Sequence, residues 1–363
     1  MADKKIRVAI NGFGRIGRLF FRQAAKEDVI EIVAVNDLGD LENLAYLLKY
    51  DSVYRRYGAD VKTDKSAGEM IVDGRRIKFL QEKDPSKLPW KDLRVDVVIE
   101  ATGVFESYES ARAHLLAGAG KVIITAPAKD ADGSVSSPQG GADGSINLPQ
   151  DGVGGKTILV GINEGELESC NLISNGSCTA NAASPVIAIM AEEPGIAKAI
   201  LNTVHGYTAT QNLVDGPTKG EDMRRGRAAG ENIVPSTTGA AIAVTRALPE
   251  LEGKFDGIAL RVPVIAGSIV DITFVAKRKT SVEEINGIFR KAAESSRWKG
   301  ILSVTEDQLV SSDIIGESYA SIVDLQFTKV VDGDLVKVLA WYDNEWGYGT
   351  TLVRHIKNLA ELA

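Results

Sequence analysis

The stretch IRVAINGFGRIGRLFF, residues 6–21, decides the fold class. Residues 6–10 are an apolar run typical of a buried strand, and apolar residues recur at helical spacing from Ile16 onward. Between them, Gly12, Gly14 and Gly17 match G-x-G-x-x-G, a turn that brings a helix N-terminus against a pyrophosphate. The pattern alone is a weak signal, but its place between a strand and a helix predicts a Rossmann-type dinucleotide-binding unit.

A carboxylate follows the next predicted strand, residues 31–35. Asp37 lies twenty residues after Gly17, where an acidic side chain accepts hydrogen bonds from an adenosine ribose. The same carboxylate would repel the 2′-phosphate of NADP, so we expect NAD as the cofactor. The alternative, an ordinary turn residue after a strand, leaves this spacing unexplained.

The alternation of strands and helices continues through the first half of the chain. Residues 96–103 and 121–127 are continuous apolar runs, as in a parallel sheet covered on both faces. The predicted helix 108–117 between them carries His114, interpreted as a structural or surface histidine. Residues 130–155 are rich in Gly, Ser, Asp and Pro, and predict an exposed, mobile insertion. A strand is predicted to resume at residues 157–161.

The pattern changes after residue 177. Helices are predicted near residues 178–190, 240–247 and 282–293, and strands at 198–204, 258–263, 269–275, 321–323 and 335–342, with a long loop at 207–235. We therefore expect an α+β catalytic and oligomerisation domain with a mostly antiparallel sheet over residues 178–344. The NAD-binding domain would span residues 1–177 and be completed by a C-terminal helix at 345–363.

A candidate nucleophile marks the boundary between the two predicted domains. Cys178 follows the strand-like Leu172-Ile173 and begins a helical pattern, with Ser177 as its N-cap. A helix N-terminus favours a thiolate, the reactive form of cysteine. A buried structural cysteine is the commoner alternative, but its flanks are polar, and His205 lies in a second loop where it could act as the base.

Composition excludes several classes of protein. The chain has 363 residues, a net charge of −7 and two cysteines, Cys170 and Cys178. This favours a reducing cytoplasm over a disulfide framework, and it argues against strong nucleic-acid binding. No stretch is long and apolar enough for a membrane span, no signal-like region follows the charged N-terminus, and no Cys/His spacing indicates a metal site.

Several long motifs occur together in the chain: NGFGRIGR at 11–18, ATGVF at 101–105, SCT at 177–179, YTATQ at 207–211, DGP at 215–217 and WYDNEWGY at 341–348. In this set the chain resembles the phosphorylating glyceraldehyde-3-phosphate dehydrogenases, from Lys5 to the C-terminal helix. The segment 130–155 departs from the family by its greater length.

The resemblance implies a set of site residues. Cys178 would be the nucleophile and His205 its base. NAD would contact Arg15, Ile16, Asp37, Lys83, Thr125 and Asn344. The substrate phosphate would bind Thr208 and Arg261, and inorganic phosphate would bind Ser177, Thr179, Thr238 and Gly239, with Arg227 adding positive charge.

The residues themselves support these roles to different degrees. Arg261 lies between Leu260 and Val262 in an apolar strand, where a buried arginine needs an anion. From spacing alone, Thr208 and Thr238 are ordinary loop or cap residues. Arg227 is equally consistent with a solvated charge or an inter-subunit contact, and Lys83 with a polar turn.

The implied reaction is the NAD- and phosphate-dependent oxidation of D-glyceraldehyde 3-phosphate to 1,3-bisphosphoglycerate in glycolysis. It would pass through a hemithioacetal and a thioester on Cys178, in a cytoplasmic homotetramer. Two alternatives remain: an erythrose-4-phosphate dehydrogenase or other aldehyde dehydrogenase, and an additional binding role toward nucleic acid or a host surface.

Overall fold

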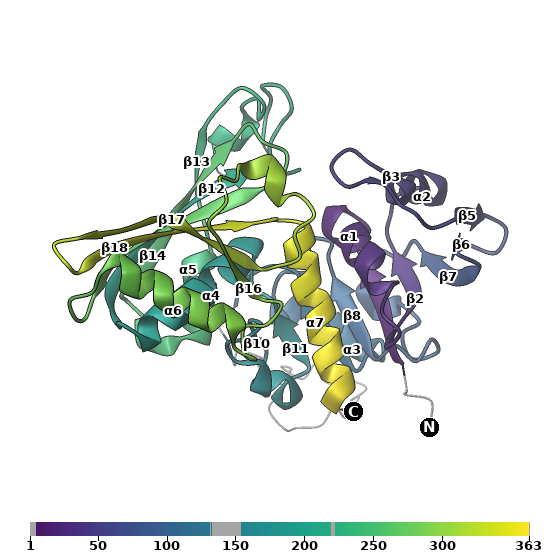
Figure 1. The fold of residues 1–363 in the computed structure, drawn as a ribbon. Helices are drawn as coiled ribbons and strands as arrows, with labels where there is room; N and C mark the ends of the chain where they lie inside the picture. Colours follow the sequence, from purple (N-terminus) through teal and green to yellow (C-terminus); the bar gives the residue numbers. More distant parts are fainter. Residues whose placement is uncertain (1–4, 131, 133–153, 219–221, 363) are drawn as a thin grey trace.

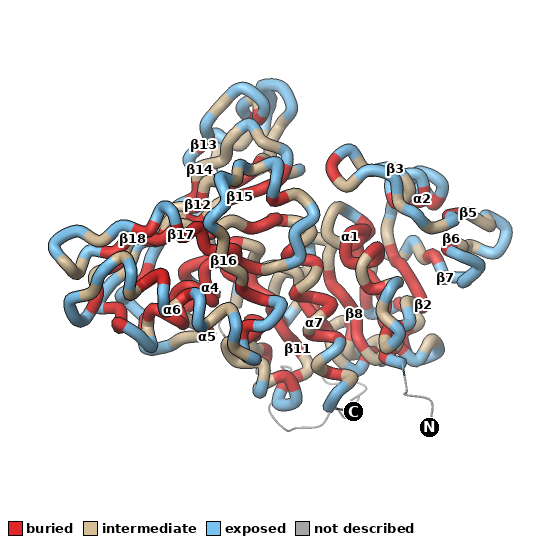
Figure 2. Tube along the Cα trace, viewed as in Figure 1, coloured by how far each residue is buried: buried red, intermediate tan, exposed pale blue. Residues whose placement is uncertain are grey.

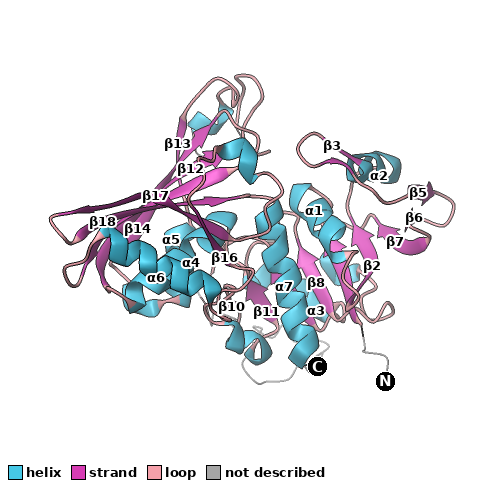
Figure 3. Ribbon diagram, viewed as in Figure 1, coloured by secondary structure: helices cyan, strands magenta, loops and turns pink. Residues whose placement is uncertain are grey.

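The computed structural model describes residues 5–130, 132, 154–218 and 222–362. Two sheets lie side by side with helices packed on them (Figure 1 and Figure 3). Strands from residues 6–174 build the first sheet, and strands from residues 196–342 build the second. The predicted combination of a Rossmann-type sheet and an α+β unit is confirmed.

The first sheet has nine strands in the order β10-β11-β9-β8-β1-β2-β7-β6-β5. Seven run parallel: β1 (Ile6–Asn11), β2 (Ile30–Asn36), β7 (Arg75–Leu80), β8 (Val97–Glu100), β9 (Lys121–Ile124), β10 (Lys156–Thr157) and β11 (Leu172–Ser174). An antiparallel edge is added by β5 (Val61–Asp64) and β6 (Glu69–Val72). From β1 the chain proceeds to β2 on one side and later to β8 on the other. This reversal creates a crevice at the carboxyl ends of the strands, where such sheets bind ligands.

Four helices belong to this half: α1 (Arg15–Ala24), α2 (Leu41–Lys49), α3 (Tyr108–Leu116) and the C-terminal α7 (Trp346–Leu362). A small antiparallel pair, β3 (Tyr50–Asp51) and β4 (Arg55–Arg56), follows α2. As predicted, α7 returns to the first half and lies beside α1 (Figure 1). Gln23 on α1 donates to the Trp346 carbonyl at 3.0 Å and accepts from Thr350 at 2.7 Å.

The second sheet has seven strands in the order β13-β14-β12-β15-β18-β17-β16. They are β12 (Ile196–Gly206), β13 (Val234–Thr237), β14 (Phe255–Val262), β15 (Ser268–Ala276), β16 (Leu302–Thr305), β17 (Ser321–Val331) and β18 (Leu335–Tyr342). Pairing is antiparallel except between β12 and β14 and between β16 and β17, so the predicted mostly antiparallel sheet is confirmed. Short 3-10 helices at Pro85–Lys87, Glu164–Ser169, Met223–Gly226, Pro249–Leu251 and Ser311–Ile314 lie in connections.

Three helices, α4 (Cys178–Glu192), α5 (Ala240–Ala247) and α6 (Val282–Glu294), cover one face of the second sheet. α4 is almost wholly buried and also contacts α7, so it lies where the two halves meet. Figure 2 shows buried residues along the centre of both sheets. The helix that begins at Cys178 is therefore a core helix with a fixed position. Among the described helices, none has the length and apolarity that a bilayer span requires.

The predicted strand at residues 157–161 is wrong beyond Thr157. The chain turns there: the Ile162 amide donates to the Leu159 carbonyl at 3.1 Å, and Gly161 has φ +74°. Ile158, Leu159 and Val160 are nonetheless buried. The apolar run correctly indicates that these residues are buried, but they lie in a turn. Apolar character alone does not distinguish a buried strand from a buried connection.

Most of the predicted insertion, residues 131 and 133–153, lies outside the described residues. Its two ends are well defined. Asp132 accepts from the Tyr108 hydroxyl at 2.8 Å and from the Thr157 amide at 2.8 Å. A β-carbon at Gly155 would lie 2.1 Å from the Tyr108 ring. Both ends are thus held against α3 and β10.

Candidate active site

Two hollows meet at the carboxyl edge of the first sheet. Ala101, Thr102 and Phe105 line both, so the hollows adjoin. The larger, about 830 Å³, has Gly12, Gly14, Asp37 and Lys83 in its wall. The smaller, about 400 Å³, is lined by these predicted site residues: Arg15, Ile16, Thr125, Ser177, Cys178, His205, Thr208, Arg261 and Asn344. Residues from both halves of the chain therefore share one continuous site.

The glycine turn has the shape that a pyrophosphate requires. Gly12 has φ +94°, and a β-carbon there would lie 2.5 Å from the Thr102 amide nitrogen. A β-carbon at Gly17 would lie 2.1 Å from the Gly12 carbonyl. Gly14, the N-cap of α1, has open space where a side chain would be, and no side chain caps the helix. The uncapped amides and the open cradle fit the diphosphate of NAD.

Asp37 is held at the end of β2 by the glycine turn itself. Its Oδ2 accepts from the Phe13 amide at 2.7 Å and its Oδ1 from the Gly39 amide at 2.8 Å. Each carboxylate oxygen keeps a free lone pair, since an ionised carboxylate accepts about four hydrogen bonds. This geometry fits an acceptor for ribose hydroxyls.

Other predicted cofactor residues are fixed by neighbours. Arg15 forms an ion pair with Asp51 at 2.5 Å and a second one with Glu345. Thr125 donates to the Glu100 carbonyl at 3.0 Å. Asn344 accepts at Oδ1 from the Ser268 hydroxyl at 2.8 Å, which leaves its amide NH₂ available as a donor.

Cys178 occupies the first position of α4, as predicted. Ser177 caps the helix, accepting at its hydroxyl from the Ala180 amide at 3.1 Å. Gly176, with φ +61°, turns the chain from β11 into the helix. The sulfur lies 3.3 Å from His205 Nε2. The two residues come from α4 and the end of β12, so the sheet and its covering helix bring them together.

His205 Nδ1 has two close neighbours. The Gly206 carbonyl oxygen lies at 2.6 Å and Arg261 Nη1 at 2.6 Å. The carbonyl can only accept and the guanidinium can only donate, so the two contacts favour opposite tautomers of the imidazole. In the tautomer that donates from Nδ1 to Gly206, Nε2 faces Cys178 with its lone pair free to accept a proton. Arg261 is there because β12 and β14 pair in a register that sets His205 opposite Arg261.

Burial shifts the pKa values of Cys178 and His205. It raises the pKa of the Cys178 thiol, while the Arg261 charge and nearby hydrogen bonds act in the opposite direction. It also lowers the pKa of His205 to about 3, with a further contribution from Arg261. The expected stabilisation of a thiolate by the helix terminus is therefore outweighed by desolvation. The His205 imidazole is therefore neutral at neutral pH.

Among the predicted phosphate ligands, Ser177, Thr208 and Arg261 line the smaller hollow, whereas Thr179, Thr238 and Gly239 do not. The Thr238 hydroxyl accepts from the Ala240 amide at 3.2 Å, next to Gly239, the N-cap of α5. A β-carbon at Gly239 would lie 3.6 Å from Pro127, which lines the hollow. Thr179 lies beneath the site, 2.9 Å from the Tyr342 hydroxyl. Arg227 is not brought to the site: it is exposed and paired with Asp215 at 2.8 Å.

Sequence reasoning missed two supporting residues. Arg225 donates to Thr210 at 3.2 Å and to Ser236 at 3.0 Å. Burial lowers the pKa of Arg261, and the charge of Arg225 adds to this effect. Arg224, Arg225 and Arg227 lie close together in the sequence, and spacing alone does not distinguish Arg225 from Arg227. Tyr342 is buried under the catalytic pair, with its ring centroid 6.0 Å from that of His205. It lies within the WYDNEWGY motif, which was the available signal.

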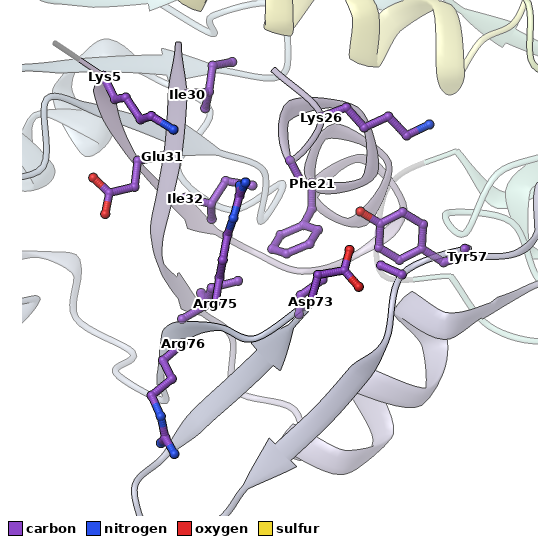
Figure 4. Close-up of a pocket in the computed structure, with 15 residues that line it drawn as sticks. Lys5, Phe21, Lys26, Ile30, Glu31, Ile32, Tyr57, Asp73, Arg75 and Arg76 are labelled. Carbon is purple, nitrogen blue, oxygen red and sulfur yellow. The ribbon is translucent and has the colours of Figure 1, made fainter. Parts of the chain in front are cut away.

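A third hollow, about 860 Å³, lies at the amino ends of β2 and β7 (Figure 4). Its wall combines charged residues such as Lys5 and Arg75 with Phe21 and Tyr57. It contains none of the predicted site residues. Ligands of parallel sheets bind at the opposite, carboxyl edge, so this hollow is not the catalytic site.

Comparisons with known proteins identify the family of the chain. Two family models match: the glyceraldehyde 3-phosphate dehydrogenase NAD binding domain over residues 6–108 and its C-terminal domain over residues 177–344. The glyceraldehyde-3-phosphate dehydrogenase of Streptomyces coelicolor is 46% identical over 351 residues, covering 96% of each chain. That of Borreliella burgdorferi is 46% identical over 355 residues, covering 96% of this chain and 98% of the relative. Glyceraldehyde-3-phosphate dehydrogenase 2 of Bacillus subtilis is 42% identical over 358 residues, covering 98% and 97%. The chain belongs to the glyceraldehyde-3-phosphate dehydrogenase family.

Proposed function

We propose that this chain catalyses the glycolytic reaction of its family, the oxidation of glyceraldehyde 3-phosphate with NAD and inorganic phosphate to 1,3-bisphosphoglycerate and NADH. The observation that carries the proposal is the Cys178–His205 pair, 3.3 Å apart, in the wall of a cavity that adjoins the glycine cradle. A thiol beside an imidazole base is an arrangement suited to covalent catalysis on a carbonyl.

Cys178 forms the covalent intermediates. As the sulfur attacks the aldehyde carbon, the thiol proton passes to His205 Nε2 and the carbonyl oxygen becomes an oxyanion beside the N-terminus of α4. His205 returns this proton to the oxyanion, which gives the hemithioacetal and leaves Nε2 free again. His205 then removes that hydroxyl proton while the carbon–hydrogen bond releases a hydride. NAD, when bound, accepts this hydride. A phosphate oxygen attacks the resulting thioester, and the carbon–sulfur bond breaks to give the acyl phosphate and free Cys178.

The neutral state of His205 suits this role. An imidazole with a pKa of about 3 is unprotonated at neutral pH, so Nε2 is ready to accept a proton. The pair therefore works by proton transfer during attack, and a permanent thiolate–imidazolium ion pair is not required.

The cofactor residues divide between the two hollows. The α1 terminus at Arg15 and Ile16 would hold the pyrophosphate, Asp37 the adenosine ribose, and Lys83 and Thr125 further parts of NAD. Asn344 would donate its amide to the nicotinamide carboxamide, in the orientation that Ser268 supports.

Two anion sites serve the two phosphates. Thr208 and Arg261 would bind the substrate phosphate, since Arg261 has no carboxylate partner among the described residues. Ser177, Thr179, Thr238 and Gly239 would receive inorganic phosphate. Arg225 replaces Arg227 in this proposal, because Arg225 hydrogen-bonds within the site and Arg227 is paired on the surface.

We propose a cytoplasmic homotetramer with a catalytic and oligomerisation domain from residue 178 to 344. The uncovered face of the second sheet carries Ile200, Ile258 and Phe327, each more than half exposed, and the 207–235 loop exposes Leu213 and Met223. Large exposed apolar areas mark protein contacts. Light scattering after size exclusion tests this: a monomer at micromolar concentration would contradict it.

The test of the activity is NADH formation, followed by absorbance, from glyceraldehyde 3-phosphate with and without inorganic phosphate. We expect sustained turnover only with phosphate. Erythrose 4-phosphate is the matched substrate, and a higher kcat/KM for it would favour the alternative dehydrogenase. Phosphate-independent release of a free acid would refute the phosphorylating reaction.

A further inference from the structure

Buried hydrogen bonds link the carboxyl ends of three neighbouring strands beneath the cofactor site. Glu100 ends β8, Asn11 ends β1 and Asn36 ends β2. Asn11 Nδ2 donates to Glu100 Oε2 at 2.6 Å, and Asn36 Nδ2 donates to Asn11 Oδ1 at 2.7 Å. All three side chains are buried, Glu100 with 2% of its surface exposed. A carboxylate is thus enclosed at the edge of the sheet where ligands bind.

Each neighbour of this carboxylate is a hydrogen-bond donor. Besides Asn11, the Thr102 amide donates to Oε1 at 2.8 Å and the Thr102 hydroxyl donates to the same oxygen at 2.5 Å. His114 Nε2 lies 3.0 Å from Oε2. A carboxyl group surrounded by donors is satisfied as the anion and needs no proton of its own.

His114 supplies a hydrogen bond to Glu100 without a positive charge. The indole nitrogen of Trp90, which can only donate, lies 2.9 Å from His114 Nδ1. Nδ1 must therefore be the unprotonated acceptor, which makes the imidazole neutral with its proton on Nε2. The negative charge of Glu100 is solvated by neutral groups and is not cancelled by a cation.

The other charges around the smaller hollow are balanced or belong to its anion site. Arg15 pairs with Asp51 and Glu345, and Glu106 pairs with Lys129 at 2.9 Å. Among the described charged residues that line this hollow, Glu100 is the acid without a cationic partner and Arg261 is the base without an acidic one. Arg261 would meet the substrate phosphate, which leaves the charge of Glu100 available to a cationic ligand.

The chemistry of hydride transfer indicates which cation Glu100 would meet. The hydride leaves a carbon bonded to Cys178, so the nicotinamide ring must lie beside Cys178, in the hollow that Glu100 also lines. This ring is a cation in the oxidised cofactor and neutral in the reduced one. A charge buried under the cavity floor acts on it with little screening by salt.

We propose that Glu100 is an electrostatic positioning residue whose buried negative charge, held by Asn11, Thr102 and His114, favours the cationic nicotinamide of NAD over the neutral nicotinamide of NADH. The enzyme would then retain the oxidised cofactor and release the reduced one. The inference rests on the proposed placement of the nicotinamide beside Cys178.

The test compares the dissociation constants of NAD and NADH by isothermal titration calorimetry, in the wild type and in Glu100→Gln. Two unit charges roughly 12 Å apart at an effective dielectric constant of about 20 change a binding ratio roughly tenfold. We therefore expect the affinity for NAD, relative to NADH, to fall on the order of tenfold in Glu100→Gln. An unchanged ratio in a folded variant would overturn the proposal.

Two further variants separate charge from shape. Glu106→Gln removes another carboxylate from the same hollow, one already paired with Lys129, and should leave the ratio unchanged. Glu100→Asp keeps the charge and should stay within about threefold of the wild type, by the same Coulomb reasoning. A shift in either variant as large as that of Glu100→Gln would overturn the proposal.

A wild-type measurement covers the case in which Glu100→Gln does not fold, as judged by circular dichroism. The wild type should bind NAD at least as tightly as NADH. Tighter binding of NADH by on the order of tenfold would overturn the proposal. These readouts are equilibrium affinities, so they are independent of whether glyceraldehyde 3-phosphate is turned over, which tests the proposed function separately.

Discussion

Replacing His205 by glutamine should make the protein less sensitive to acid. His205 is buried, with 3% of its surface exposed, and burial lowers its pKa from 6.5 to about 3. As the pH falls below 6.5, the unfolded chain takes up a proton on this residue before the folded chain does. The stabilising contribution of neutral His205 is therefore complete above pH 6.5 and is lost progressively as the pH falls toward the folded pKa of about 3.

The size of the loss follows from the pKa values. Each pH unit between the two pKa values costs about 1.4 kcal/mol, so acidification from about pH 7 to about pH 5 should remove about 2 kcal/mol through His205. His355, whose pKa burial lowers to about 4, should remove about 2 kcal/mol more by the same reasoning. In His205→Gln only the second loss remains.

The measurement is equilibrium urea unfolding of both proteins between pH 7 and pH 5, at one chain concentration. Carboxylates contribute equally to both proteins and cancel in the difference. His355→Gln serves as a control at a histidine that does not line the hollow around Cys178, and it should reduce the pH dependence by a similar amount. A His205→Gln protein with the same pH dependence as the wild type would show that His205 is not held neutral. This result would contradict the proposal that a neutral His205 accepts the proton of Cys178.

Four other changes test the site. Cys178→Ser should abolish NADH formation while NAD binding, measured by calorimetry, persists, because a serine hydroxyl stays protonated where a thiolate can form; near-normal turnover would exclude Cys178 as the nucleophile. Asp37→Ser should narrow the preference for NAD over NADP, measured as a ratio of kcat/KM; a wild type that already prefers NADP would contradict the role of Asp37. Gly12→Ala should lower the unfolding temperature and the NAD affinity, since φ is +94° and the new β-carbon would lie 2.5 Å from a backbone atom. The strained φ alone costs about 1–3 kcal/mol. The control Gly14→Ala places its β-carbon in open space and should leave the unfolding temperature unchanged. Deleting residues 134–153, with Asp132 kept for its bonds to α3 and β10, should leave soluble, active enzyme, because the segment is poor in apolar residues; insoluble or inactive protein would show that the segment is structural.

Structural features that depend on a few residues close together in the chain could be predicted from the sequence alone. The glycine turn, the carboxylate after the second strand and the cysteine at a helix start each depend on a short run of residues with defined backbone preferences. The two types of sheet followed from the change at residue 177, where continuous apolar strands alternating with helices give way to a different order of strands and helices. The prediction from local sequence was wrong at residues 157–161. An apolar run indicates that residues are buried, but the hydrogen bond to the Leu159 carbonyl and the positive φ of Gly161 make this segment a turn.

Features that join distant residues were decided only by the tertiary structure. Strand register sets Arg261 opposite His205, and loop packing brings Arg225 rather than Arg227 to the site. The Glu100 carboxylate is surrounded by neutral donors because Trp90 fixes the tautomer of His114, and these three residues come from separate segments of the chain. The pKa of Cys178 also belongs here: its sequence context indicates a stabilised thiolate, but burial raises the pKa. Desolvation depends on everything that surrounds a group, and a chain acquires those surroundings only when it folds.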